Sequence, residues 1–221
     1  MDPVVVLFVR ADSIYKTLPG VDCYDAERDA RTWPGGCSVV AHPPCRGWGR
    51  LAHMSNATED EKALGPWAVA QVQRWGGVLE HPEHSRLWKS CPNMAQIGFT
   101  LRVRQCRWGH RATKPTWLYV CGCRPEDVPP IPNGPDEGTH YLAQDRRRNV
   151  RSVNAAKPRL PDREREATPP AFAVWLVELA RRCGKHNSAI SLKVEVNAPR
   201  DGNGDAMLDA SATKETALCS R

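Results

Sequence analysis

The chain has 221 residues, of which 41% are hydrophobic and 25% charged, a composition typical of a globular protein. Its apolar start, Pro3 to Val9, is too short to span a bilayer and follows no basic stretch, so we expect neither a membrane segment nor a secretory signal. The net charge of +6 favours polyanionic partners. The spacing of the nine cysteines does not suggest a disulfide framework, so we expect reduced thiols and a cytoplasmic protein.

The first part of the chain predicts three short strands. Val4 to Val9 is a continuous apolar run typical of a strand covered on both faces, and Val21 to Tyr24 predicts a second strand that ends at Asp25. Arg10 to Gly20, between them, has a single glycine, whereas a cofactor-binding turn usually carries more. Ser38 to Ala41 predicts the third strand, and two prolines then force the backbone into a stiff turn.

Cys45 follows this turn, just beyond the end of the third strand. Ligands bind at the carboxyl ends of strands in open α/β sheets, and the neighbouring Arg46 would favour the thiolate form of the cysteine. The alternative is a plain loop in which Cys45 is only a small apolar residue. The tripeptide Pro-Pro-Cys alone does not separate these two interpretations.

A helix is predicted over Thr58 to Trp75, because Thr58 and Glu61 form a capping-box pattern and apolar residues recur on one face. Gly76 and Gly77 end it, and a strand beginning at Val78 and Leu79 is expected to stop at Glu80. Pro82 then turns the chain away. The succession of strand, reactive side chain and proline turn therefore occurs twice.

Two further strands are predicted over Thr100 to Arg104 and Thr116 to Val120. Arg124 to Pro135 is rich in proline and has no periodicity, which indicates a surface loop. Gln144 to Glu166 carries eight basic and four acidic residues, among them Arg146, Arg147 and Arg148. Both a solvated loop and an arm that contacts phosphates fit this segment.

A second helix is predicted over Thr168 to Arg182 and is expected to end at Gly184, and residues 186–221 indicate a disordered tail. Strands that alternate with helices favour an α/β fold, a Rossmann-like and mostly parallel sheet with helices on both faces. We expect one compact domain over residues 1–185. Within it, residues 124–167 form a Pro- and Arg-rich insertion.

The order of these motifs resembles that of the DNA cytosine-C5 methyltransferase family. The segments HPPCRGW, VLEHPEHS and RQCRWGHRATKPTWLYVCG stand where the family has its Pro-Cys loop, its Glu-Asn-Val turn and its Gln-x-Arg segment. VLFVRADSIYKTLPGVDCYDAERDA looks like the family's cofactor-binding start, and EATPPAFAVWL looks like its last motif. The resemblance covers roughly residues 4 to 183 and indicates a short, divergent, phage-type member with a methyltransferase-like fold.

The resemblance implies a transferase that acts on cytosine in DNA, or in a free nucleotide, flipped out or single-stranded. The implied catalytic residues are the nucleophile Cys45, the acid Glu80 and the basic residue Arg107. The implied cofactor is S-adenosylmethionine, without a metal. Carbon 5 of cytosine is a poor nucleophile, and a thiolate that adds at carbon 6 makes it reactive. Glu80, if burial raises its pKa, would stay protonated and bond the ring nitrogen and exocyclic amine.

Further residues receive roles by the same resemblance. S-adenosylmethionine would contact Phe8, Pro43 and Asp25, with Asp25 on a ribose hydroxyl. DNA or the base would contact the following residues: Gln105, Arg46, Trp48, Lys114, Arg146, Arg147 and Arg148. Trp108 is a second candidate to stack on the base or fill the gap it leaves.

The departures from the family pattern leave alternatives open. The side chains of Arg10 to Lys16 replace the Gly-rich first motif, so a different cofactor, or a catalytically inactive nucleic-acid-binding protein, also fits the sequence. The target-reading region is reduced to the stretch between Cys123 and Thr168. A structural zinc site built from Cys106, His110, Cys121 and Cys123 is a further alternative.

Overall fold

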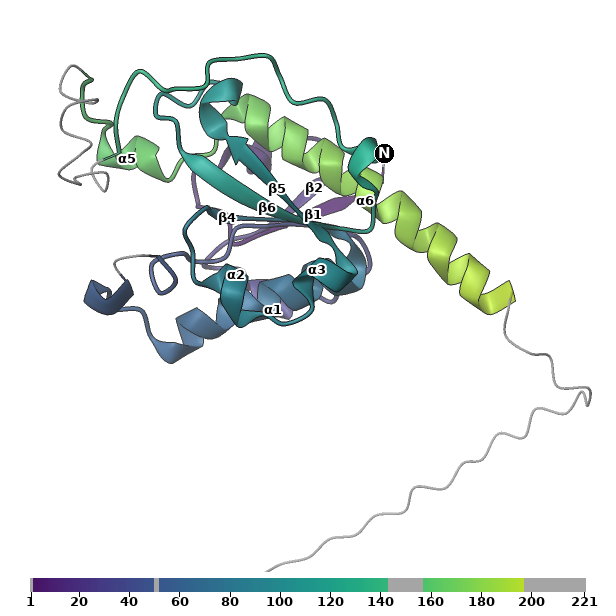
Figure 1. The fold of residues 1–221 in the computed structure, drawn as a ribbon. Helices are drawn as coiled ribbons and strands as arrows, with labels where there is room; N and C mark the ends of the chain where they lie inside the picture. The colour runs from purple at the N-terminus through teal and green to yellow at the C-terminus, as the bar shows by residue number, and fades with distance from the viewer. Residues whose placement is uncertain (1, 50–51, 143–156, 197–221) are drawn as a thin grey trace, which may run out of the picture.

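A computed structural model describes residues 2–49, 52–142 and 157–196, with side chains as far as Gly184 (Figure 1). Its centre is one six-stranded sheet with the strand order β2-β1-β3-β4-β6-β5. The strands are β1 (Val4–Leu7), β2 (Val21–Tyr24), β3 (Ser38–Ala41), β4 (Gly77–Pro82), β5 (Phe99–Arg104) and β6 (Pro115–Cys121). The first four are mutually parallel, and β6 runs antiparallel to both β4 and β5. The predicted α/β fold with a mostly parallel open sheet is therefore confirmed.

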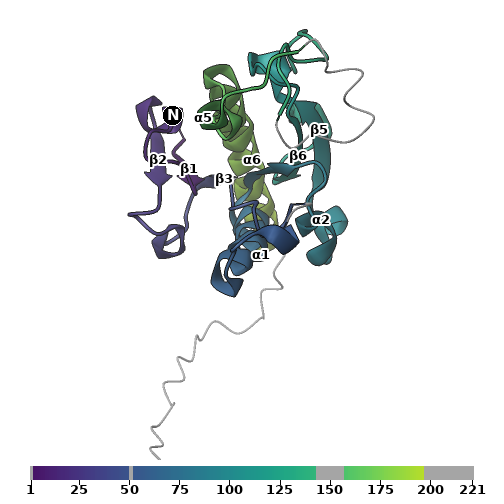
Figure 2. The same ribbon diagram turned by 90° about the vertical axis from the view of Figure 1, so that its left-hand side faces the viewer.

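Helices cover both faces of this sheet (Figures 1 and 2). One face carries α1 (Glu59–Trp75), α2 (Leu87–Ser90) and α3 (Met94–Ile97), and the other carries α6 (Pro170–Val196). Short 3-10 helices complete the chain: η1 (Ile14–Thr17), η2 (Ala30–Thr32), η3 (Ala52–Met54), η4 (Gln105–Trp108) and η5 (Pro125–Asp127), with the single-turn α5 (Asp162–Arg165) before α6. No helix among the described residues is long and apolar enough to cross a membrane.

Two apolar layers hold the helices to the sheet because successive side chains of a strand point to opposite faces. In β1, Val5 and Leu7 join the α1 layer, whereas Val4 and Val6 join the α6 layer. The predicted last helix buries one apolar stripe completely, formed by Phe172, Leu176, Leu179 and Cys183. Buried Ala68 and Val72 bear out the predicted apolar face of α1. The sequence pattern therefore identified both faces of the core.

Helix boundaries follow local chemistry at α1 but not at α6. Thr58 caps α1 by accepting a hydrogen bond from the Glu61 amide, and Gly76 ends the helix with a φ of 75°. The predicted end of the last helix at Gly184 is wrong, because α6 continues to Val196. Glycine is costly but tolerated inside a helix, at about 1 kcal/mol. The predicted disordered tail is consequently helical at its start, and residues 197–221 lie outside the described part of the chain.

The topology brings the ends of five strands to one edge of the sheet. The carboxyl ends of β1, β3, β4 and β5 lie there, together with the amino end of the antiparallel β6. β2 and β3 flank β1 on its two sides, so the strand order switches direction at β1. This switch point also lies at the same edge. Such an edge is the usual position of a ligand site in open α/β sheets.

The substitution Gly77→Ala is expected to destabilise the protein strongly. A Cβ atom at Gly77, whose φ is 129°, would lie 2.0 Å from the carbonyl oxygen of Val39 in the neighbouring strand. Gly36→Ala is the matched control, because Gly36 has a φ of 101° and nothing within 4 Å of the added atom. Both variants carry backbone strain of about 1–3 kcal/mol.

Only Gly77→Ala adds the clash, so we expect it to lose about 2 kcal/mol more than the control. Urea unfolding of the two variants measures the difference. Equal midpoints would contradict the close approach of β3 and β4.

Candidate active site

The side chain of Glu80, near the end of β4, is the centre of a hydrogen-bonded network at the sheet edge. Its Oε2 lies 3.1 Å from Nδ1 of His42, and its Oε1 accepts a hydrogen bond of 3.1 Å from Nε2 of Gln105. The other ring nitrogen of His42, Nε2, lies 2.9 Å from the buried Tyr15 hydroxyl. The ring contacts are satisfied when Tyr15 donates to Nε2 and Nδ1–H donates to Glu80.

Glu80 is ionised in this network, which corrects the expectation of a protonated acid. Burial alone would raise the pKa of the carboxyl, as the sequence analysis assumed. The hydrogen bond from His42, the charge of Lys114, and the charges that His42 and His81 carry when protonated outweigh burial together and lower the pKa to about 2. A carboxylate that accepts several hydrogen bonds is stabilised in its charged form. Glu80 is therefore a negative acceptor and not a proton donor at neutral pH.

Gln105 positions Glu80 from the end of β5. The side chain is 1% exposed and its Nε2 also donates to the Thr116 hydroxyl at 3.0 Å. Its Oε1 is buried and has no hydrogen-bond partner among the described residues. A buried acceptor without a partner is costly, so a ligand with an N–H group would find a ready partner here. The predicted contact of Gln105 with substrate remains a prediction.

Cys45 lies at the same edge, in the turn that follows β3, and it is exposed. Its carbonyl accepts hydrogen bonds from the amides of Trp48 and Gly49 at 3.0 and 2.9 Å, which closes the turn. The pKa of the thiol is raised by desolvation first and then by the charges of Glu80 and Glu166. The expectation that Arg46 favours the thiolate is therefore wrong, because Arg46 forms an ion pair with Glu61 of α1.

Lys114, and not Arg107, is the basic residue whose charge acts on both Cys45 and Glu80. Lys114 lies just before β6, and its charge lowers the pKa of both Cys45 and Glu80. Burial lowers its own pKa, and its Nζ donates to the Ala167 carbonyl at 3.1 Å. The backbone φ of Lys114 is 41°, a strained value for this residue type and one found often at functional sites.

Arg107 points elsewhere. It lies in η4 and forms an ion pair of 2.5 Å with Asp136 in the Pro-rich loop. No contact joins it to Glu80 or Cys45. Sequence spacing did not indicate Lys114 in place of Arg107, because Lys114 reaches the sheet edge only through a turn. That turn pairs it with Gln105, whose backbone amide donates to the Lys114 carbonyl at 3.3 Å.

The two tryptophans proposed to stack on a base are both held in the protein. Trp108 is 5% exposed and packs against Phe172 and Trp175, so its predicted role is wrong. Trp48 is half-buried and donates from Nε1 to the Lys62 carbonyl at 3.2 Å. Its ring also lies against Gly65 of α1. Trp48 therefore helps to hold the Cys45 turn on α1.

The predicted DNA contacts Arg146, Arg147 and Arg148 lie outside the described residues.

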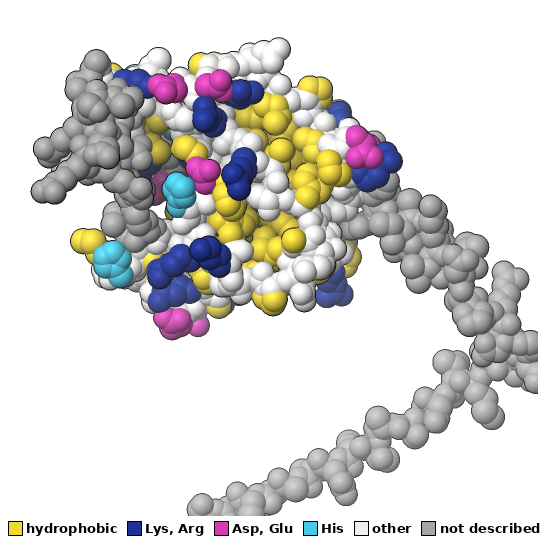
Figure 3. All heavy atoms as spheres, viewed as in Figure 1, with side chains coloured by type: hydrophobic (Ala, Val, Ile, Leu, Met, Phe, Trp, Pro, Cys, Tyr) yellow, Lys and Arg dark blue, Asp and Glu magenta, His cyan; other side chains and the backbone are white. Residues whose placement is uncertain are grey.

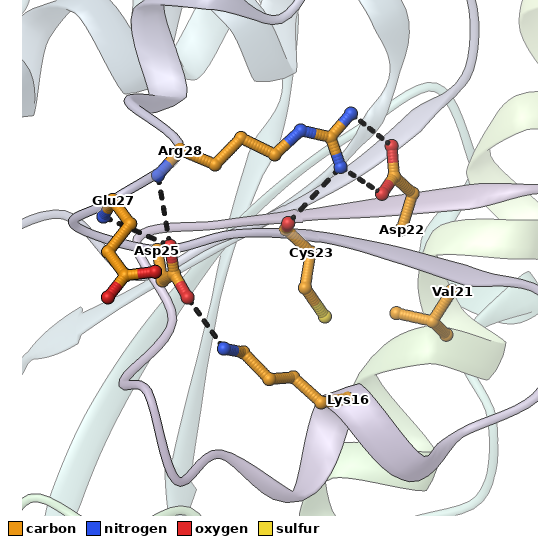
Figure 4. Close-up of a pocket in the computed structure, with 7 residues that line it drawn as sticks. All are labelled: Lys16, Val21, Asp22, Cys23, Asp25, Glu27 and Arg28. Carbon is orange, nitrogen blue, oxygen red and sulfur yellow. Dashed lines mark hydrogen bonds and ion pairs between the residues drawn. The ribbon is translucent and has the colours of Figure 1, made fainter.

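The region assigned to S-adenosylmethionine does not fit that group well. Asp25, expected to bind a ribose, already accepts from Lys16 at 2.6 Å and from the amides of Glu27 and Arg28 (Figure 4). The Lys16 hydrogen bond is the main reason why the pKa of Asp25 falls to about 2. These contacts occupy the carboxylate beside a pocket lined by β2 residues.

The turn after β1 is likewise filled by protein groups. Phe8 leaves the strand with a φ of 64°, which shortens the predicted strand by two residues, and its ring packs edge-on against Trp67. Arg10 and Asp12 form an ion pair of 2.9 Å. Pro43 is buried beneath the Cys45 turn. No glycine brings the backbone of this turn close to a ligand, and we therefore derive no step through S-adenosylmethionine.

The zinc alternative loses its geometric basis. The described residues contain no group of three or more His, Cys, Asp or Glu that could hold a metal ion. Cys106 donates to the Pro135 carbonyl at 3.1 Å, and Cys123 lies 3.3 Å from Cys183 of α6. His110 contacts the Ala112 and Glu164 carbonyls. Three of the four proposed ligands are therefore engaged separately.

The surroundings of Cys45 predict how fast its thiol reacts with iodoacetamide. Removing the nearby negative charge in Glu166→Gln should lower the pKa of Cys45 and speed alkylation at pH 8, by up to about tenfold for one pKa unit. Lys114→Met should slow it, because the lysine stabilises the thiolate. Mass spectrometry of the Cys45 peptide measures both rates. Identical rates in the two variants would show that these charges do not act on the thiol.

The lowered pKa of Glu80 predicts a specific loss of stability in acid. A carboxyl whose pKa falls from 4.5 to about 2 on folding stabilises the native state above pH 4.5. This contribution, about 3 kcal/mol, is lost as the pH falls from 4.5 through 2. Urea unfolding at pH 5 and pH 2.5 should show a smaller acid loss for Glu80→Gln than for the wild type. The exposed Glu27→Gln serves as control, and an unchanged acid loss in Glu80→Gln would contradict the network.

No protein-family model matches this chain, and neither the curated proteins nor the solved structures include a match. The chemistry of the site is therefore argued from its own residues. These are an exposed thiol, an ionised carboxylate and a desolvated amine at one sheet edge.

Proposed function

We propose that this protein is a cytosine-C5 modifying enzyme that acts on DNA, or on a cytosine nucleotide, through a covalent adduct with Cys45. The observation that carries the proposal is the meeting of Cys45, Glu80 and Lys114 at the switch edge of the sheet. These residues come from three separate segments, so their convergence is a product of the fold. The order of their motifs gives the chemical class.

The reaction begins when the Cys45 thiol loses its proton to water and the thiolate adds to carbon 6 of the base. The new S–C bond pushes electrons toward carbon 5 and the ring nitrogen N3, and N3 takes up a proton from water, which leaves a neutral adduct. Carbon 5 is then an enamine carbon that bonds an electrophile. Loss of the original hydrogen of carbon 5 as a proton, cleavage of the S–C bond and return of the N3 proton to water restore the thiolate and the aromatic ring.

Glu80 supports this sequence as an anion. A carboxylate has about four acceptor sites, and His42 and Gln105 use one each. The remaining sites suit two hydrogen bonds from the base, one from the exocyclic amine and one from N3–H of the neutral adduct. The contact with His42 also gives a path by which a proton reaches the carboxylate. In this proposal His42 is a positioning residue that sequence reasoning missed.

Lys114 stabilises negative charge in the same reaction. Its ammonium favours the Cys45 thiolate and would bond the base carbonyl, the role first given to Arg107. A base inside a duplex cannot reach this edge, so the substrate is single-stranded or flipped out. The simplest electrophile is a proton from water, because that exchange needs no other group.

A catalytically inactive nucleic-acid-binding protein is the second candidate. The observation that favours it is the raised pKa of Cys45, since an activated nucleophile normally has a lowered pKa. Such a protein would bind DNA with a strong salt dependence and would bind it equally well after Cys45→Ala.

The proposed enzyme should exchange the hydrogen on carbon 5 of cytosine with solvent. We expect single-stranded DNA in deuterium oxide to gain deuterium at that carbon with the wild type, and not with Cys45→Ser. Exchange should fall by about tenfold or more in Lys114→Met and Glu80→Gln. Mass spectrometry of the released nucleosides measures it, and Cys91→Ser is a control at a thiol outside the network.

Absence of exchange with DNA binding retained would favour the inactive binder. A parallel arm contains S-adenosylmethionine. Methyl transfer in that arm would contradict the poor fit of S-adenosylmethionine at β1 and β2. It would still support the Cys45 adduct.

A further inference from the structure

A row of aromatic and cationic side chains crosses the sheet face that carries α2. Trp117 of β6 is the register partner of both His81 in β4 and Arg102 in β5. The guanidinium carbon of Arg102 lies 4.6 Å from the centre of the Trp117 ring. Trp88 of α2 continues the row, with its ring 5.9 Å from that of Trp117. We call Arg102, Trp117, Trp88, Arg86 and Lys89 the α2 face.

The cations of the α2 face are available to a partner. Arg86, Lys89 and Arg102 are exposed, and none forms an ion pair with an acidic side chain in the described part of the chain. Most other arginines at this edge are neutralised, such as Arg104 by Asp136 and Arg111 by Glu164. Lys and Arg side chains gather on this view of the surface (Figure 3). The nearby acid Glu83 lies 3.8 Å from His84.

The α2 face is joined directly to the Cys45 turn. The amide of Arg86 donates to the carbonyl of Trp48 at 2.9 Å, and Trp48 in turn donates to Cys45. Arg86 and Lys89 are three residues apart in one helical turn, so they lie on the same side of α2. The α2 face therefore starts beside the thiol, on the opposite side of the sheet from Glu80.

We propose that the α2 face binds a single-stranded nucleic acid, so that the chain flanking the target nucleotide passes from Arg102 over Trp88 to the Cys45 turn. Unpaired cations attract phosphates, and half-buried tryptophans and a stacked guanidinium offer flat surfaces to bases. An acidic polypeptide would pair with the cations of the α2 face, but its side chains would not stack on the tryptophans. This inference rests on the proposed function only for the position of the target nucleotide.

The test measures binding without catalysis. A fluorescein-labelled oligo(dT), which contains no cytosine, is titrated with the full-length protein at several salt concentrations, and anisotropy gives the dissociation constant. Arg102→Gln should weaken binding by about threefold to tenfold and lower the slope of log K against log salt by about 0.7. The double variant Arg86→Gln with Lys89→Gln should lower the slope by about 1.4.

Arg74→Gln is the matched control, because Arg74 is also exposed and lies over a tryptophan ring, Trp75, at the end of α1. It should leave the slope unchanged. Irradiation of an oligonucleotide that carries 5-bromodeoxyuridine should crosslink peptides with Trp88 or Trp117. Absence of hydrogen exchange in the wild type, together with normal binding of oligo(dT), refutes the enzyme but not the α2 face.

Equal effects of Arg74→Gln and Arg102→Gln, or crosslinks only outside the α2 face, would overturn the proposal. Competition by polyglutamate as strong as that by oligo(dT), with no crosslink to a tryptophan, would also overturn it. That result would indicate an acidic polypeptide partner.

Discussion

The ionised carboxylate of Glu80 is the constraint on which the organisation of the sheet edge depends. A buried negative charge is stable only when donors and positive charge surround it. Here those donors come from two different strand ends, His42 after β3 and Gln105 after β5. Tyr15 after β1 fixes the histidine in turn. One charge therefore ties together segments that are distant in sequence and sets the geometry around Cys45.

Desolvation first, and the same charge second, raise the pKa of the Cys45 thiol in the free protein. Glu80 raises the pKa of Cys45 and Lys114 lowers it, so the two neighbours oppose each other. A base whose exocyclic amine donates a hydrogen bond to Glu80 would partly neutralise the charge of the carboxylate. The opposition to the thiolate would then weaken when substrate is present. Such coupling would make the thiol reactive only when substrate is bound.

The proposed chemistry and the proposed nucleic-acid binding lie on opposite faces of the sheet. The α6 side holds the charged network of Tyr15, His42 and Glu80, because alternate residues of β4 point to opposite faces. His81, the next residue, points to the α2 side and packs edge-on against Trp88. Burial lowers the pKa of His81 to about 4, so it is a neutral support for the α2 face. Adjacent residues of one strand thus serve the chemistry and the proposed binding of the flanking chain.

The sequence by itself located the strands and the two long helices, and it placed Cys45 and Glu80 at strand ends. Apolar runs located β1, β3 and β6, the capping pattern located α1, and the proline turns pointed to Cys45 and Glu80 at strand ends. Local signals suffice for these features because strand burial, helix caps and turns depend on neighbouring residues. The tertiary structure alone decided the charges and partners. In the folded protein Glu80 is ionised, and Lys114 lies near the Cys45 thiol. Arg46 forms an ion pair with Glu61, and Arg107 forms one with Asp136. A pKa and an ion pair depend on the distance between the interacting groups. The antiparallel β6 and the switch between β1 and β3 bring these groups together, and the spacing of residues in the sequence does not predict how close they lie.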